Sequence, residues 1–310
     1  MDFAAELGAL TVQIPDGRVA MCVDLAVALG DPVAARAVFR VAQDDTEIPN
    51  RHRIVTSDGR PIHRTSAKQL RAEGVPFVHG RVSGVTEIRH ASFRTSRPLA
   101  ALREEQTRLR DRVRFRDGFQ RLRTVGGVDL AYADGFAIAA AVVCMFPDGK
   151  PIAMSSVRET VRFPYIPGYL AYREAPAVTE CVETLDAKPD VLMIDGHGVL
   201  HPARFGLACL VGLQLGLPTI GCAKSPLIGH LASTPPPRRS APIILDGRIL
   251  GRAFRPGSSR RLVYVSVGHN VSLNSAVRIV RSLCRSAVPE PLRMAHVHAT
   301  EIRKRIMKSK

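Results

Sequence analysis

The alternation of apolar and polar residues changes character near residue 124. Three apolar segments follow, bounded by turn signals such as Asp134-Gly135, and they predict hairpin-linked strands. A helix near 177–187 comes next, and short buried strands then alternate with apolar helices. This order predicts an α/β fold with a mixed sheet and flanking helices. The expected strands cover 125–135, 136–146, 151–161, 189–198 and 217–225, and the later helices cover 204–216 and part of 266–284.

The first third of the chain predicts a small, mostly helical domain. Residues 23–30 and 32–43 show two short helical patterns, separated by Gly30-Asp31. Pro32 stands at the first turn of the second pattern, a position that proline favours. The spacing is typical of a helix-turn-helix, winged-helix-like domain, although any helical hairpin gives a similar pattern.

The segments after residue 43 indicate where one domain ends and the next begins. An irregular basic stretch at 48–64 leads to a short helical segment at 66–75 and a connector at 78–98. From Leu99 to Arg123 the pattern is helical and strongly basic, as expected either of a solvated helix or of a contact with phosphates. We expect a first domain at 1–88, a linker at 89–98 and a second domain at 99–310.

The charge of the chain favours a polyanionic partner. Lys and Arg number 44 against 28 Asp and Glu, which gives a net charge of +16. No run of eighteen apolar residues occurs, and the N-terminus lacks a basic region before an apolar stretch, so neither a membrane span nor a signal peptide is expected. The six cysteines form no C-x-x-C pair, which argues against structural zinc and favours the reducing cytoplasm.

Three acidic residues form the candidate catalytic group. Asp129 lies in an otherwise apolar strand, Asp195 ends another strand, and Glu174 follows a proline-rich loop. Each alone could be a turn or cap residue, but acids at strand ends of a mixed sheet converge at one edge. Their mutual repulsion would be relieved by a divalent cation such as Mg²⁺ or Mn²⁺. On a basic protein, this pattern predicts metal-assisted hydrolysis of a phosphodiester bond.

Six long motifs lead to a more specific prediction. They are "GVDLAYADG", "FPYIPGYLAYREAP", "PDVLMIDGHGVLHPARFGLA", "LPTIGCAKSPLIG", "VSVGHNVSL" and "PEPLRMAH". In order and spacing they resemble the endonuclease V family, which nicks nucleic acid near deaminated purines, and the resemblance runs from about residue 95 onward. It implies a ribonuclease H-like fold and a Mg²⁺-dependent nuclease that cuts on the 3′ side of deoxyinosine in damaged DNA.

The resemblance also implies roles for individual residues. Asp129, Glu174 and Asp195 match the metal-binding carboxylates of the family, His296 matches a fourth catalytic position, and Lys224 matches a lysine near the scissile phosphate. The proline-stiffened loop matches a wedge that opens the duplex beside the lesion, at a cost of roughly a few kcal/mol for unstacking. The wedge is Pro164, Tyr165, Ile166 and Pro167; Gly168 and Leu170 match the base pocket, and Arg173, His201 and Asp190 match supporting positions.

The first domain has a second resemblance. Residues 14–43, with "IPNRHRIVTSDGR" and "LRAEGVPF", are similar to the DNA-binding domain of O6-alkylguanine-DNA alkyltransferases and alkyltransferase-like proteins. Where the transferases have a nucleophilic cysteine, this chain has Asn50-Arg51, so alkyl transfer is not expected. The resemblance implies that Arg36 replaces a flipped base and that Val33, Ala34 and Ala35 lie on a helix that enters the minor groove. The alternative is a remnant that serves only as a DNA clamp.

Two other functions remain open at this point. One is an endoribonuclease that acts on inosine-containing RNA, and the other is a non-enzymatic sensor of damaged or alkylated DNA. A DNA-binding domain at the N-terminus favours DNA, and the acids Asp129, Glu174 and Asp195 favour an enzyme.

Overall fold

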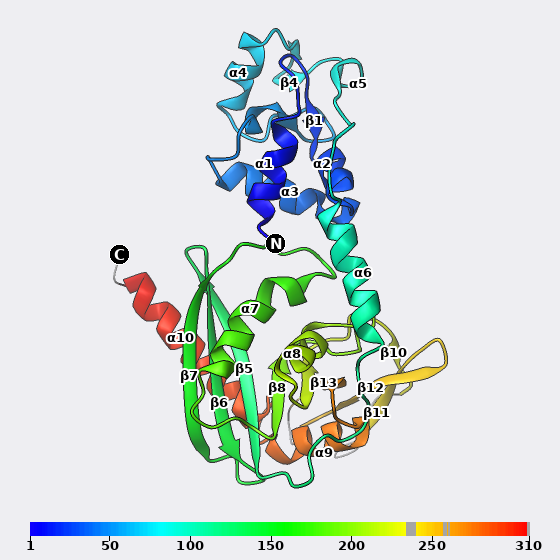
Figure 1. The fold of residues 1–310 in the computed structure, drawn as a ribbon, viewed down its shortest axis with the longest axis vertical. Helices are drawn as coiled ribbons and strands as arrows, with labels where there is room; N and C mark the ends of the chain where they lie inside the picture. Colours follow the sequence, from blue (N-terminus) through cyan, green and yellow to red (C-terminus); the bar gives the residue numbers. More distant parts are fainter. Residues whose placement is uncertain (234–239, 257–258, 260, 309–310) are drawn as a thin grey trace. The chain divides into compact units, whose positions relative to one another are not determined.

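A computed structural model describes residues 1–233, 240–256, 259 and 261–308. The chain forms two compact units, which are coloured along the sequence in Figure 1. The first unit is Met1–Glu105 with Arg162–Pro167, and the second is Gln106–Val161 with Gly168–Lys310. Residues 89–98, the predicted linker, lie within the first unit. In the described part of the chain, no helix combines the length and the apolar character needed to span a bilayer.

The first unit contains the predicted helix pair. Helix α2 (Cys22–Leu29) ends at Gly30, whose φ of 107° belongs to the left-handed region that glycine favours. The Asp31 carboxylate then accepts a hydrogen bond from the Val33 amide and starts a 3₁₀ turn that leads into α3 (Ala35–Asp44). The remaining elements are α1 (Phe3–Thr11), β1 (Ala20–Met21), β2 (Ile54–Val55), α4 (Ser66–Ala72), β3 (Phe77–Val78), β4 (Arg81–Val82), α5 (Val85–Ile88) and the start of α6 (Pro98–Arg110).

A buried arginine ties the irregular stretch of this unit together. Arg53, 7% exposed, donates from Nη1 to the Ile14 carbonyl, forms an ion pair with Asp16, and donates from Nε to both carboxylate oxygens of Glu73 at 3.0 Å. The Glu73 carboxylate also lies 2.7 Å from His52 Nε2. Because the planar guanidinium has five donors, one side chain links several segments that have little regular structure.

The second unit is built on one mixed sheet of nine strands. Its order is β10-β11-β12-β13-β9-β8-β5-β6-β7, with β5, β8 and β9 parallel to one another and the other neighbours antiparallel. The mixed α/β fold expected from the sequence is therefore confirmed. The strands are β5 (Thr124–Ala133), β6 (Phe136–Met145), β7 (Pro151–Thr160), β8 (Val191–Asp195), β9 (Thr219–Ala223), β10 (His230–Leu231), β11 (Ser240–Leu245), β12 (Arg248–Phe254) and β13 (Val263–His269).

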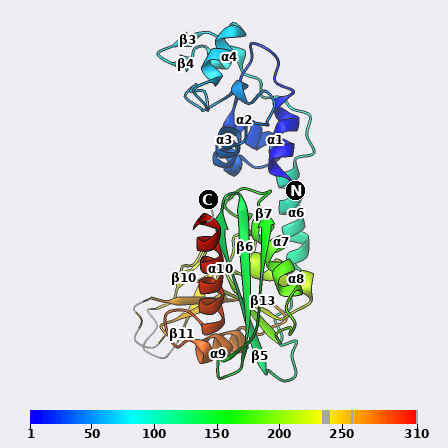
Figure 2. The same cartoon turned by 90° about the vertical axis from the view of Figure 1, so that its left-hand side faces the viewer.

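Helices cover both faces of the sheet at β6, which explains its unbroken apolar sequence. Ala139 and Ala141 pack into the main core with α7 (Leu170–Glu183) and α8 (Leu207–Leu215). The alternate residues Val142 and Cys144 pack with Ala295 of α10 (Glu290–Lys308). Successive side chains of a strand point to opposite faces, so the apolar residues of β6 pack against a helical layer on each face of the sheet. Figure 2 shows α10 lying along β6. Helix α9 (Leu273–Leu283) completes the unit.

Two predicted helices differ from the structure in their bounds. Helix α6 ends at Arg110 instead of continuing to residue 123, because the chain turns there and buries Val113 in the core of the sheet. Helix α7 begins at Leu170, earlier than the predicted 177, and contains Pro176 in its interior. The prolines in and before this segment led the sequence analysis to place the start of the helix too late, because an internal proline ordinarily ends a helix. The sequence analysis also missed α1, α10 and the strands β10, β11, β12 and β13.

The Arg53 cluster gives a prediction for stability. Burial by itself would raise the pKa of the Glu73 carboxyl, but hydrogen bonds from Arg53, His52 and the Gly17 amide lower it to about 2. Replacing Glu73→Gln leaves Arg53 buried without this carboxylate, and we expect a loss of about 3 kcal/mol in the free energy of unfolding at pH 7. Thermal melting followed by circular dichroism measures the change.

The pH dependence of this loss has a defined sign. A carboxyl whose pKa is depressed on folding stabilises the protein above its unfolded pKa and loses that contribution as the pH falls through its folded value. The difference between wild type and Glu73→Gln should therefore shrink as the pH falls from about 4.5 toward about 2. Glu104→Gln, a change at an exposed residue of α6, is the control; an equal effect there would contradict the assignment.

Candidate active site

Strand register brings two carboxylates side by side. Val128 of β5 pairs with Ile194 of β8 in a parallel register, so Asp129 and Asp195 are the next residues along the two neighbouring strands. Paired residues of parallel strands point to the same face, about 4.8 Å apart. Asp129 is 9% exposed, and burial together with the charge of Asp195 raises the pKa of its carboxyl. The Leu130 amide and His296 oppose that rise by hydrogen bonding.

Glu174 joins these aspartates from helix α7. It is 9% exposed, and Oε1 accepts a hydrogen bond from the Tyr132 hydroxyl at 2.7 Å. The Arg173 guanidinium lies 4.5 Å from the centre of the Tyr132 ring. Burial raises the pKa of Glu174 to about 7; the charges of Asp129 and Asp195 add to the rise, and Tyr132 and Arg173 oppose it. The three predicted acids therefore act on one another electrostatically, as expected of a common site.

Lys224 supplies a positive charge at the same place. It follows β9 directly, and its Nζ lies 2.9 Å from Oδ2 of Asp195. Burial lowers the pKa of an ammonium group, but the hydrogen bond and the charge of Asp195 outweigh that effect and raise the pKa of Lys224. Its side chain is 71% exposed, so the cation faces solvent while it is held by the carboxylate.

His296 reaches Asp129 because α10 approaches β5 unusually closely. A Cβ at Gly127 would lie 2.3 Å from the carbonyl carbon of Pro291, so only glycine allows this approach. Gly127 and Asp129 share one face of β5, and Nδ1 of His296 lies 2.7 Å from Oδ2 of Asp129. The imidazole is 62% exposed, which leaves one edge of the ring open to a ligand.

The acids have the donor chemistry of a hard divalent cation. Within the described ranges, no three His, Cys, Asp or Glu side chains already form a set that could hold a metal ion. Asp129, Glu174 and Asp195 are instead each paired with His296, Tyr132 or Lys224. Burial and mutual repulsion raise the pKa values of Asp129 and Glu174, and a cation among their oxygens would offset both effects. The residues fit such an ion in chemistry and in charge.

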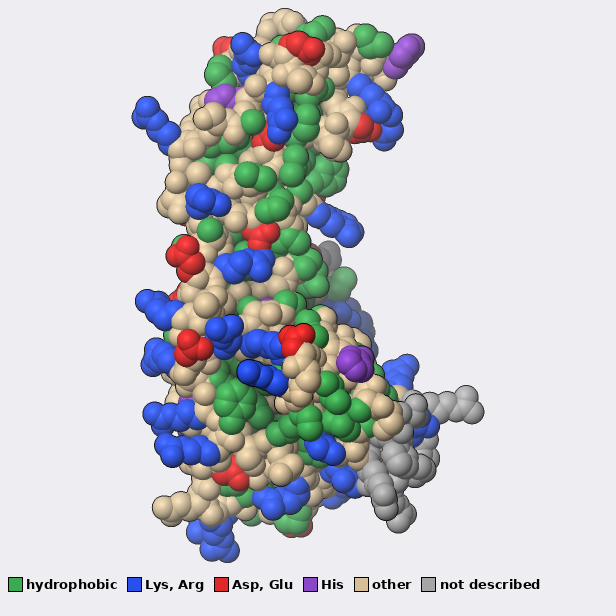
Figure 3. Space-filling model, turned by 90° about the vertical axis from the view of Figure 1, so that its right-hand side faces the viewer, with side chains coloured by type: hydrophobic (Ala, Val, Ile, Leu, Met, Phe, Trp, Pro, Cys, Tyr) green, Lys and Arg blue, Asp and Glu red, His purple; other side chains and the backbone are tan. Residues whose placement is uncertain are grey.

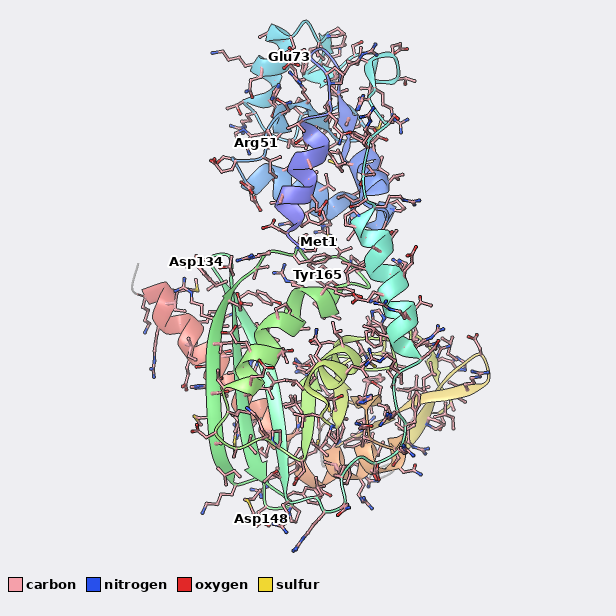
Figure 4. The ribbon with its side chains drawn as sticks, viewed as in Figure 1. Met1, Arg51, Glu73, Asp134, Asp148 and Tyr165 are labelled. Atoms are coloured by element: carbon pink, nitrogen blue, oxygen red, sulfur yellow. The ribbon has the colours of Figure 1, made fainter. Side chains whose placement is uncertain are left out.

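The proline-rich loop exposes only one of the two side chains between its prolines. Tyr165, labelled in Figure 4, is 64% exposed. Ile166 is fully buried, so the expectation that the loop displays both residues is wrong for Ile166. Pro164 is partly buried and Pro167 is exposed. The stiffened backbone therefore presents Tyr165 while its neighbour is packed inside.

The base-pocket candidates follow the loop. Gly168 has a φ of 85°, and its carbonyl accepts a hydrogen bond from Nε2 of Gln106, a residue that is 1% exposed. Leu170 begins α7 and is partly buried. Gln106 thus fixes the backbone where the loop meets the helix, a role that sequence reasoning missed.

Of two supporting residues, His201 is buried and Asp190 is partly buried. His201 is 6% exposed, and its Nδ1 accepts a hydrogen bond from the Ala203 amide at 3.2 Å. Asp190 accepts from the amides of Arg123 and Thr124 and joins the starts of β8 and β5. Both positions hold backbone near the strands that carry the acids.

Sequence reasoning also missed His197, two residues after Asp195. Among the described residues, none forms a hydrogen bond with its buried Nδ1. Burial lowers the pKa of His197 to about 4, against an opposing effect of the Ser225 backbone, so the ring is neutral at pH 7. The Asp-Gly-His-Gly run was the available signal, but a histidine after a strand is also compatible with an ordinary turn.

The predicted DNA-contact residues of the first unit are on and near α3. Arg36 is exposed, Ala35 is partly buried, and Val33 is 42% exposed. Asn50, which stands near the position of the transferase nucleophile, has a left-handed φ of 51°. Cys22 is buried, and burial raises the pKa of its thiol to about 12, so the thiol is protonated at neutral pH.

Comparison with known proteins places this site in a family. The endonuclease V family model matches residues 107–297, which is more than half of the chain and includes Asp129, Glu174 and Asp195. The chain belongs to the endonuclease V family. Endonuclease V from Roseiflexus castenholzii is 44% identical over 205 residues, which cover 66% of this chain and 92% of that protein.

Two further relatives extend the comparison. A bifunctional methyltransferase/endonuclease from Picrophilus torridus is 33% identical over 311 residues and covers 98% of both chains. The structure of endonuclease V from Ciona intestinalis, in complex with a 24mer DNA that contains an inosine followed by a ribo-adenosine, is 26% identical with a TM-score of 0.61. That match covers 68% of this chain and all of the other. The Picrophilus protein therefore matches the first unit as well as the endonuclease V domain.

The approach of α10 in this endonuclease V domain gives a second prediction. Gly127→Ala would force Pro291 away from β5, and we expect the free energy of unfolding to fall by about 2 kcal/mol or more. Thermal melting measures the loss. At Gly196 the nearest atom to an added Cβ is 3.5 Å away, so Gly196→Ala should leave the melting temperature nearly unchanged. Equal melting temperatures for Gly127→Ala and wild type would contradict the close approach.

Proposed function

We propose that this protein hydrolyses a phosphodiester bond on the 3′ side of deoxyinosine in DNA, in the presence of Mg²⁺ or, as an alternative, Mn²⁺. The observation that carries the proposal is the placement of Asp129, Glu174 and Asp195 within one partly buried site of an endonuclease V domain. The inosine-containing DNA bound to the Ciona intestinalis relative supports the choice of lesion.

The three carboxylates are the proposed metal ligands. When bound, the cation supplies Lewis-acid polarisation of the phosphate and offsets the negative charge of the site. Tyr132 orients Glu174 by donating a hydrogen bond to Oε1, and Oε2 would then be the oxygen offered to a cation. His296 orients Asp129 in the same way, through the hydrogen bond between Nδ1 and Oδ2.

Lys224 and His296 are proposed to act on the substrate. The raised pKa of Lys224 keeps its ammonium group charged, and the group can donate hydrogen bonds to a non-bridging phosphate oxygen. The leaving oxygen must gain a proton, and the exposed imidazole of His296 is a group that can hold one. Arg173 faces Tyr132 and supports the Glu174 side of the site.

Recognition of the lesion is assigned to the loop and to the first residues after it. Tyr165 is the exposed side chain with which the enzyme would fill the gap beside an unstacked base. The prolines on either side keep it in place before DNA arrives, so less ordering is needed on binding. Gly168 and Leu170 are the proposed positions of the base pocket.

The first unit is proposed to be an alkyltransferase-like module that binds damaged DNA. The support is the match of the Picrophilus torridus protein, which includes this unit, and the exposure of Arg36 on α3. The Arg53–Glu73 cluster gives the module a fixed shape without much regular structure. The buried thiol of Cys22 is a poor nucleophile, so binding rather than alkyl transfer is proposed.

Strand cleavage tests the nuclease. A labelled duplex with one deoxyinosine should be nicked with Mg²⁺ and remain intact with EDTA. Asp195→Asn keeps the size of the side chain but removes its charge, and we expect the rate to fall by more than about 100-fold. Gel electrophoresis of the denatured strands measures the rate.

Two further substrates are assayed for cleavage and binding in parallel. One is a matched RNA that contains inosine, and the other is a DNA duplex that contains O6-methylguanine. Asp186→Asn, a change at an exposed acid after α7, is the control and should keep the wild-type rate. Cleavage of the RNA alone would move the assignment to an endoribonuclease. Tight binding of either lesion without nicking would leave a damage sensor.

The first unit has its own test. Arg36→Ala should weaken the binding of a lesion-containing duplex by about 10-fold, because an arginine that enters the duplex contributes both charge and stacking. Fluorescence anisotropy in EDTA measures the affinity, with Arg18→Ala in the same unit as the control. Unchanged affinity of Arg36→Ala would contradict the proposed role of the module in DNA binding.

A further inference from the structure

The proline-rich loop belongs to the first unit, although in the sequence it lies between two elements of the second unit. The segment Arg162–Pro167 follows β7 and precedes α7, and it packs as part of the first unit. Tyr165, the side chain assigned to lesion recognition, is one of its residues. The first unit therefore carries both α3, the helix proposed to contact DNA, and the loop proposed to open the duplex.

The start of helix α1 holds the first residue of this loop. The carboxylate of Asp2 accepts a hydrogen bond from the Ala5 amide, so the helix begins at Phe3. Amides in the first turn of a helix have no partner within that helix. The Phe3 amide donates instead to the Arg162 carbonyl at 3.0 Å, two residues after the end of β7. A carbonyl group that has left the sheet is thus paired with the end of a helix.

An aromatic contact fixes the next residue of the loop. The rings of Phe3 and Phe163 meet edge to face, with their centres 6.1 Å apart and an angle of 76° between their planes. Aromatic pairs prefer this arrangement over a stacked sandwich, and both side chains are buried. The amide and the ring of Phe3 therefore hold two successive residues of the loop.

Tyr165 is presented by buried neighbours on both sides. Phe163 and Ile166 are buried, whereas Tyr165 between them is exposed. The prolines of the loop restrict its backbone, so fixing the buried side chains also limits the positions that Tyr165 can take. Met1 and Tyr165 are labelled in Figure 4 and mark the two segments that meet through Phe3.

Helix α1 is itself anchored in the core of the first unit. Leu7 and Leu10 follow Phe3 by four and seven residues, so the three share one face of the helix. All three are buried, and α1 packs against α2 and α3. The loop is thus connected through one helix to the helix pair that is proposed to bind DNA.

We propose that Phe3 is a positioning residue for lesion recognition, which holds the loop so that Tyr165 enters the duplex when the first unit binds DNA. This inference rests on the proposed function for the role of Tyr165. A base in a duplex must be unstacked before an enzyme acts on it, whereas an unpaired base is already accessible. Loss of the Phe3 contact should therefore affect a paired deoxyinosine more than an unpaired one.

The test compares wild type with Phe3→Leu, which keeps an apolar side chain but removes the ring. Single-turnover cleavage with Mg²⁺ at saturating enzyme gives the maximal rate, so a change in affinity does not enter. On a duplex with one paired deoxyinosine this rate should fall on the order of 10-fold, because small misplacements of a group are costly. On a duplex of the same length with deoxyinosine in an unpaired bubble, the rate should fall by about 2-fold at most.

A second readout follows base opening without cleavage. 2-Aminopurine beside the deoxyinosine becomes more fluorescent when it is unstacked, and the complex is formed in EDTA at saturating enzyme. The increase on binding should be smaller for Phe3→Leu than for wild type. Affinity, measured by anisotropy, should change little, because many Lys and Arg side chains lie on the face of the second unit displayed in Figure 3 and contacts between them and phosphates do not depend on the loop.

Further variants separate positioning from stability. Phe163→Leu removes the other ring of the pair and should give a similar loss. The double variant Phe3→Leu/Phe163→Leu should lose no more than the larger of the two single variants, since both act through one contact. Leu10→Val also shortens a buried side chain of α1, two turns from Phe3, and should keep the wild-type rate. Melting temperatures show whether each variant is folded.

The outcomes separate the role of Phe3 from the nuclease. If Phe3→Leu nicks the paired duplex and unstacks the base as wild type does, the positioning role is wrong and the nuclease proposal stands. An equal loss in Leu10→Val would also overturn it, because the effect would then be one of stability. Wild type that unstacks the base but nicks no DNA would overturn the nuclease alone, and the fluorescence would still decide the role of Phe3. Wild type that does neither would overturn both proposals.

Discussion

Burying Asp129, Glu174 and Asp195 close to one another raises the free energy of the folded chain, because each charge loses water and meets charges of the same sign. The surrounding structure reduces that cost through His296, Tyr132 and Lys224, one partner for each carboxylate. Such an arrangement is electrostatically unfavourable until positive charge arrives. The same feature that destabilises the fold therefore provides affinity for a cation and, through it, for a phosphate.

Glycines on the strands determine how closely the partners can approach. Gly127 admits α10 to β5, and Gly198 admits the backbone of β13, where an added Cβ would lie 1.9 Å from the Val267 carbonyl oxygen. Gly221 of β9 lies against Gly198 in the same way, since a Cβ added at Gly221 would lie 2.4 Å from the Gly198 amide nitrogen. The sheet edge is thus held by backbone contacts, which change less with rotamer than side-chain contacts do. Figure 4 marks the two ends of the β5–β6–β7 meander with Asp134 and Asp148.

Much of the second unit follows from local sequence. The meander and the buried strands β8 and β9 were predicted because each has a period or an apolar run that a strand requires, with turn signals between them. Helix α7 was misplaced because Pro176 contradicts a helix locally, while burial of Val178 and Cys181 against the sheet favours one. The burial of Ile166 could not be read from a dipeptide between prolines, since it depends on residues distant in sequence. The same holds for Gln106 and Tyr132, whose partners are 62 and 42 residues away.

The pairing of Asp129 with His296 has a consequence for the time at which the site forms. The two residues are separated by 167 positions, and α10 follows all the strands in the chain. At translation speeds of about 5–20 residues per second, Asp129 leaves the ribosome roughly 10 to 30 s before its partner. A nascent chain in that interval can form the meander but lacks the imidazole and the helical cover of β6. The candidate site is therefore completed late in synthesis, after every strand of the sheet has been made.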